Sequence, residues 1–148
     1  MHPRQWSQTE FDAMSWHDCH VHSIRVIEGQ HGCGELQLDI DYILEWRQDR
    51  ANYKFLLVPT KLSFLEVFCL RVNIDWSATS AAMGPFSISG IERSIERRQN
   101  HTATVWRLPI NWPAGEIAFE ATGFLQRSWG REVLSESQVL QPEQRSEA

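Results

Sequence analysis

The densest group of side chains able to do chemistry lies in the segment 16–22. In an extended strand, residues two apart point to the same side, about 6.5–7 Å apart, so His20 and His22 are expected to face together. Two imidazoles at that spacing can share a metal ion, with His17, Asp18 or a distant carboxylate completing the shell. The segment therefore predicts a metal site at His17, His20 and His22. The alternative is that His17 and Asp18 bond to neighbouring backbone while the other two histidines lie at a rim.

Two aspartates form a second candidate. Asp39 and Asp41 lie on one side of an alternating segment, behind Glu35 and Gln37. A carboxylate pair can exchange protons with a substrate or bind a hard cation. The wet side of a half-buried strand has the same composition, and the sequence favours that interpretation. These carboxylates are expected to face water.

Three of the seven tryptophans stand next to expected turns. Trp46, Trp76 and Trp112 each end or follow an alternating run. Such side chains can fill the end of a barrel, anchor a protein interface or stack on a sugar, and we rank the roles in that order. They are the interface candidates of this sequence.

Four arginines lie near one expected hairpin: Arg93, Arg97, Arg98 and Arg107. Glutamates are interspersed with them, which favours cross-strand ion pairs on a surface. An acidic partner for this basic spot is the alternative.

The elements that must position these residues are strands. Polar and apolar residues alternate from Glu35 to Tyr42, and again in 70–76, 105–110 and 117–125. This period of two is typical of a strand with one wet and one buried face. Turn signals separate the runs at 28–34, 59–60, 97–102 and 112–115. The sequence predicts an all-β, mainly antiparallel fold of about eight strands, either a β-sandwich or a partly open β-barrel.

One segment fits two structures. Ile88, Ile91 and Ile95 recur three and four residues apart, as on a short amphipathic helix, whereas the flanking residues alternate as in a bulged strand. We predict a strand here.

The 148 residues suffice for one domain. A β-rich domain is expected over 15–134, after an N-terminal extension over 1–14. The polar composition of 135–148 predicts a disordered tail.

Charge, hydropathy and cysteine spacing indicate which classes of partner and which cellular compartment to expect. A net charge of −5 gives no reason to approach a phosphate backbone, so no nucleic acid is expected. No uncharged apolar run nears the length of a membrane span, so no membrane contact is expected. Cys19, Cys33 and Cys69 lack Cys-x-x-Cys spacing, and the first residues lack an apolar signal region. These features predict a cytoplasmic protein with free thiols.

The opening from Ser15 to Asp18, which leads directly into a strand, resembles small bacterial β-rich proteins that begin with an aromatic-His-Asp triplet. The segments 38–44, 62–67 and 115–121 are similar to that group as well. Some of its members are immunity proteins, which neutralise the toxin of a sister cell. The resemblance implies a β-rich fold and a protein partner, and it assigns no functional residues.

Binding is favoured over catalysis. The sequence has no Gly-x-Ser-x-Gly elbow and no phosphate-cradling glycine loop, and no cofactor is expected. The first hypothesis is a non-enzymatic binding protein, either toxin-immunity-like or self-associating. The second is a metal-dependent enzyme or metal-binding protein centred on His17, His20 and His22. The third is a protein that holds a small apolar ligand inside a barrel.

Overall fold

The computed structural model describes residues 2–77 and 82–147, and the fold is all-β as the alternation predicts. Ten strands in the described residues form one antiparallel sheet. The strands are β1 (Gln5–Ser7), β2 (His20–Glu28), β3 (Gly34–Asp49), β4 (Asn52–Ile74), β5 (Phe86–Ile88), β6 (Glu92–Arg97), β7 (Thr102–Trp112), β8 (Gly115–Glu120), β9 (Gly123–Ser128) and β10 (Val133–Ser135). Two 3-10 helices accompany them in this part of the chain, η1 (Gln8–Ala13) and η2 (Pro142–Gln144).

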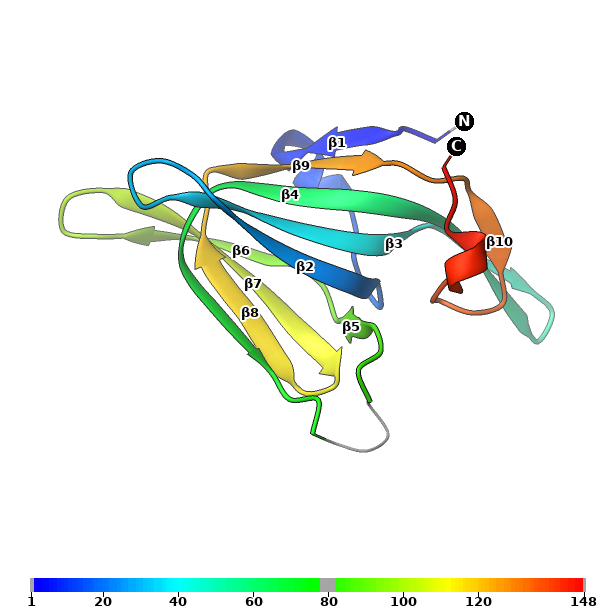
Figure 1. The fold of residues 1–148 in the computed structure, drawn as a ribbon. Coiled ribbons are helices and arrows are strands. Elements are labelled where there is room, and N and C mark those ends of the chain that lie inside the picture. Colours follow the sequence, from blue (N-terminus) through cyan, green and yellow to red (C-terminus); the bar gives the residue numbers. More distant parts are fainter. Residues whose placement is uncertain (1, 78–81, 148) are drawn as a thin grey trace.

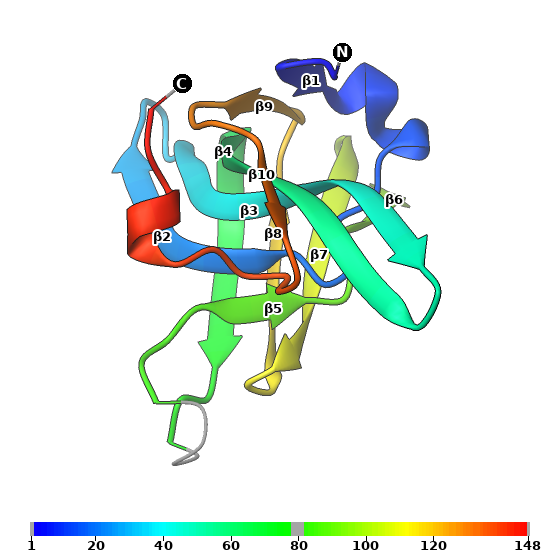
Figure 2. The same ribbon diagram turned by 90° about the vertical axis from the view of Figure 1, so that its right-hand side faces the viewer.

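The sheet curls into a partly closed ring rather than a regular barrel (Figures 1 and 2). Following the pairings around the ring gives β4, β3, β2, β5, β7 and β8, which returns to β4. Closure is weakest at β5, which is three residues long and pairs with β2 only through Phe86 and Ser87. The strand prediction for 88–98 is confirmed, because β5 and β6 cover most of it.

The long strand β4 belongs to both walls of the ring. Its first part pairs with β3 and β9, and its last part pairs with β8. A register shift between Phe68 and Arg71 accompanies the change of partner, and Glu66 and Cys69 take positive φ angles near it. Bulges of this kind bend a strand, so one strand can turn from one wall into the next.

The predicted turn at Pro59 and Thr60 is wrong, because β4 runs through both residues. Proline has no backbone N–H to donate and is tolerated where a strand lacks a ladder partner. Pro59 lies between the parts of β4 that pair with β9 and with β10. Its carbonyl accepts from the N–H groups of Trp129 (2.9 Å) and Gly130 (3.3 Å) instead. The missing donor therefore disrupts no ladder on that side.

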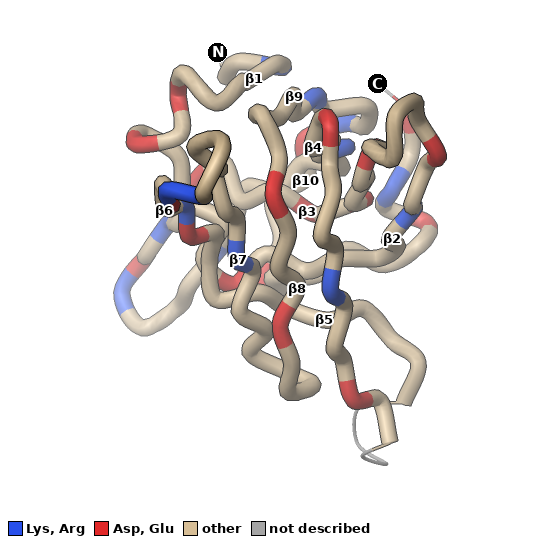
Figure 3. Tube along the Cα trace, turned by 90° about the vertical axis from the view of Figure 1, so that its left-hand side faces the viewer, with Lys and Arg blue, Asp and Glu red and all other residues tan. Residues whose placement is uncertain are grey.

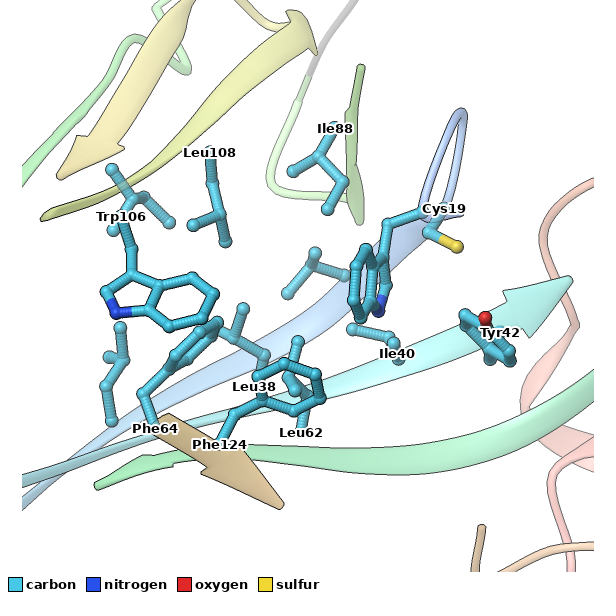
Figure 4. Close-up of a cluster of buried hydrophobic side chains, with 14 of the residues drawn as sticks. Cys19, Leu38, Ile40, Tyr42, Leu62, Phe64, Ile88, Trp106, Leu108 and Phe124 are labelled. Carbon is cyan, nitrogen blue, oxygen red and sulfur yellow. The ribbon is translucent and has the colours of Figure 1, made fainter. Parts of the chain in front are cut away.

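The interior of the ring is filled by packed side chains (Figure 4). Leu36, Leu38 and Ile40 are fully buried, which confirms the inward face predicted from the alternation. Phe64 packs edge-on against Trp106, with ring centroids 5.3 Å apart. Large aromatic side chains thus occupy the space that an internal ligand would need.

Neither end of the described chain is a free extension. Within 1–14, β1 pairs with β9, and Trp6 is buried against Tyr42 with ring centroids 5.2 Å apart. In the tail, where the polar composition predicts disorder, Leu140 is buried instead. The tail is held on β3 because the backbone N–H of Leu140 and the side chain of Arg145 bond to aspartates of that strand.

Candidate functional site

The structure gives the three predicted metal ligands separate surroundings. The Nε2 atom of His22 lies 2.6 Å from a carboxylate oxygen of Asp41. His17 is exposed, and its Nδ1 atom lies 3.1 Å from the backbone carbonyl oxygen of Ser89. The buried Nδ1 of His20 has no hydrogen-bond partner in the described residues, and burial lowers the pKa of this side chain. Within 2–77 and 82–147, no three His, Cys, Asp or Glu side chains gather as metal ligands would. The predicted trio is therefore not assembled into a metal site.

A β-bulge gives His22 its contact with Asp41. The register of β2 against β3 shifts between Val21 and Ser23, so His22 is the extra residue of the bulge. Bulges commonly re-aim a side chain at a site. Here the half-buried imidazole of β2 is directed onto the carboxylate of the neighbouring strand.

Asp41 is the centre of a buried polar cluster that the sequence does not predict, although Asp41 itself is one of the candidate residues. The prediction that Asp41 faces water is wrong, because its side chain is fully buried. Besides His22, it accepts a hydrogen bond from the backbone N–H of Leu140 (2.8 Å) and one from Nε of Arg145 (2.9 Å). Both of these donors come from the tail. A buried carboxylate needs such donors to offset the loss of water.

The Arg145 guanidinium holds two carboxylates at once. Its two terminal nitrogens lie 2.9 Å from the two oxygens of Asp39, and one of them also donates to the Ile40 carbonyl (3.2 Å). The group lies 5.2 Å from the centre of the Trp129 ring, whose indole N–H donates to Asp39 (3.1 Å). Only 9% of the Arg145 side chain is exposed. The planar fork of arginine suits this bidentate and stacked environment.

The two central charges stabilise one another. Burial tends to raise the pKa of Asp41, but the hydrogen bonds from His22 and Leu140 and the charge of Arg145 outweigh it, so the pKa is lowered. Burial tends to lower the pKa of Arg145, but the bonds and charges of Asp39 and Asp41 raise it overall. Both groups are therefore ionised at neutral pH. They form a buried ion-pair cluster that holds residues 136–147 on β3, and we call this segment the strap.

A histidine paired with an aspartate also occurs where histidine activates a nucleophile. The thiol nearest in sequence, Cys19, is fully buried, and burial raises its pKa to about 12. A neutral thiol in that environment is inert. Within this pair, Asp41 bonds to the strap and His22 bonds to Asp41, whereas the buried thiol of Cys19 is not activated.

One signal in the sequence points to this packing. Val139 and Leu140 form an adjacent aliphatic pair within an otherwise polar tail. Leu140 is the one that becomes buried, and Arg145 follows it by five residues. Their partners on β3 lie about a hundred residues earlier, where no local pattern connects them.

The interface candidates differ in exposure. Trp112, at the end of β7, is 51% exposed, and Trp46, near the end of β3, is 48% exposed. Trp76 is half-buried and packs edge-on against Phe86, with ring centroids 6.0 Å apart. Trp46 and Trp112 are therefore available for contact, whereas Trp76 covers the core.

Trp46 belongs to an arm, which we define as the β3–β4 hairpin over residues 44–55. The arm follows a register shift between Ile43 and Glu45 and projects from the ring (Figure 2). The Trp46 ring stacks on the ring of His17, with centroids 6.0 Å apart, and packs edge-on against Phe55, with centroids 5.0 Å apart. Tyr53, on the same side of β4 as Phe55, is 53% exposed. These three aromatic side chains, Trp46, Tyr53 and Phe55, form the aromatic patch, and they line a recess of about 540 Å³.

Comparison with known protein families, with curated proteins and with solved structures finds no match to this chain. In the described residues, no helix has the length and apolar character that crossing a membrane requires.

Proposed function

We propose that this chain is a non-enzymatic binding protein and that it contacts a protein partner through the aromatic patch of the arm. The observation that carries the proposal is the exposure of Trp46 and Tyr53, each about half open to solvent beside one recess. Tryptophan and tyrosine are the residues most enriched among those that dominate binding energy. Their place on a projecting hairpin makes them accessible to a large partner (Figure 2).

The arm also holds its main anchor in place before binding. Trp46 lies between the ring of His17 and the edge of Phe55. A side chain already fixed by its neighbours loses little rotamer freedom when a partner arrives, and this lowers the free-energy cost of association. The patch is therefore suited to a preformed rather than an induced contact.

Two partners fit the proposal. A toxin neutralised by this chain is the partner that the resemblance to immunity proteins implies. A second copy of the chain is the alternative, since the same exposed aromatic side chains can bury one another in a symmetric dimer.

Photo-crosslinking in the native cells tests the surface and separates the two partners. Tyr53 is replaced by photo-reactive p-benzoylphenylalanine in one variant, and Trp112 is replaced in a matched control variant. We expect one defined adduct from position 53 and none from position 112. An adduct of twice the chain mass identifies self-association, and any other defined mass identifies a different protein. An adduct from position 112 alone, or from neither position, would contradict the proposal.

A further inference from the structure

A charged recess of about 530 Å³ lies on the outer face of the wall formed by β4, β8, β7 and β6. Basic and acidic positions are interleaved on these strands (Figure 3). Six charged side chains line the recess: Arg71, Arg98, Arg107, Glu96, Glu116 and Glu120. The volume is in the range of small-molecule sites.

Glu120 is the unusual member of this set. The residue is only 7% exposed, and its Oε1 receives no hydrogen bond from an N–H or O–H group in the described residues. Its other oxygen lies 3.5 Å from Arg98, which bonds more closely to Glu96 at 2.6 Å. Cys69 lies beside the carboxylate, which raises the pKa of that thiol. A thiol is a weak donor, so a buried carboxylate oxygen here lacks a strong one.

Arg71 is the complementary group. Arg107 pairs with Glu116 (3.4 Å), whereas Arg71 has no carboxylate within 4 Å in the part of the chain that the structure describes. Arg71 and Arg107 flank Ala118 from the two neighbouring strands. The small side chain between them leaves the floor of the recess open to an anionic group.

The two groups are close enough to act on one molecule. Arg71 stands opposite Ala118, and Glu120 lies two residues further along β8. Two residues of a strand span about 6.5–7 Å. A ligand with a cationic donor at one end and an anion at the other reaches both.

We propose that this recess binds a small zwitterion whose ammonium group donates to Glu120 and whose carboxylate binds Arg71 and Arg107. The lining carries three arginines and three glutamates, so its formal charge is zero and a ligand of zero net charge is matched better than an anion such as phosphate. The site is separate from the aromatic patch of the arm, and the failure of one proposal leaves the other standing.

The test is an NMR titration of the full-length protein with ω-amino acids of increasing length, from glycine through 4-aminobutyrate to 6-aminohexanoate. We expect saturable amide shifts at Ala118 and Glu120 for the longer members. Acetate and butylamine, which carry one charge each, are expected to bind at least about tenfold more weakly.

Variants localise the binding. Arg71→Gln and Glu120→Gln are each expected to weaken it at least about tenfold, because a charge-assisted hydrogen bond is lost. Arg71 is exposed, so its variant is expected to fold normally, and Arg25→Gln on β2 is the matched control with unchanged binding. The proposal is overturned if no member of the series shifts β8, if acetate or butylamine binds as tightly, or if Arg71→Gln behaves like Arg25→Gln.

Discussion

Arg145 shows how one side chain can fix a polar segment to the fold. It bonds to Asp39 and Asp41 and is almost fully covered. Burying ions costs free energy, so such a cluster adds modest net stability compared with apolar packing. Removal of one member is different, because it leaves the opposite charge buried without a partner.

The substitution Arg145→Ala is therefore expected to lower the free energy of unfolding by about 3 kcal/mol. Urea denaturation monitored by tryptophan fluorescence measures this change. Arg127→Ala on β9 is the matched control, because that arginine is exposed and makes one 3.4 Å hydrogen bond to Gln5. Its expected loss is below about 1 kcal/mol. Equal losses in the two variants would show that the Arg145 cluster is not formed.

Asp41 predicts a particular dependence of stability on pH. Its folded pKa lies below the ordinary value of 3.8, so its ionised form is favoured by folding. This contribution is complete above the ordinary pKa and is lost as the pH falls through the lowered folded value. Compared with Asp41→Asn, the native protein is expected to hold a stability advantage at about pH 6 that shrinks toward about pH 2.5.

Urea unfolding of both proteins across that range is the measurement. Other carboxylates with lowered pKa values, such as Glu10 and Glu45, are present in both proteins and cancel in the difference. An advantage that stays constant, or grows as the pH falls, is incompatible with an ionised and bonded Asp41.

At the scale of elements, the sequence predicts those strands whose pattern is local. Leu36, Leu38 and Ile40 identify the inward face of β3 because alternation is a property of neighbouring residues. The burial of Asp41 cannot be predicted in this way, because it does not depend on neighbouring residues. Asp41 lies on the outer side of β3, and the strap that covers it comes from about a hundred residues later. The bulge that turns His22 toward Asp41 likewise leaves no local pattern in the sequence.

The strap gives a prediction at this scale. The N–H of Leu140 bonds to Asp41, so it is expected to exchange with solvent at least about tenfold more slowly than the N–H of Gln138, for which no hydrogen bond is seen in the described residues. Hydrogen exchange followed by NMR measures both amides. Arg145→Ala is expected to remove the difference. Equally fast exchange at the two positions in the native protein would mean that the tail is disordered, as its composition suggests.

For the whole molecule, the interior of the ring is packed with side chains, and the two surfaces proposed for binding lie outside it. Phe64, Phe119 and Trp106 occupy the interior, whereas the recess beside the aromatic patch and the recess beside Glu120 both open at the surface. The strap closes one side of β3, and the arm extends the same strand beyond the ring (Figure 1). A packed scaffold that carries exposed aromatic side chains on a projecting hairpin is consistent with the proposal that this chain binds another protein.

The binding proposal is tested most directly by affinities for the partner captured at Tyr53, measured by calorimetry with two variants. Trp46→Ala removes the anchor of the aromatic patch, and Trp112→Ala removes a tryptophan of nearly equal exposure elsewhere. Urea denaturation confirms that both variants are folded under the conditions of the assay. We predict at least about a tenfold loss of affinity for Trp46→Ala and less than about a twofold change for Trp112→Ala. Equal effects, or a larger effect at Trp112, would contradict the assignment of the arm as the binding surface.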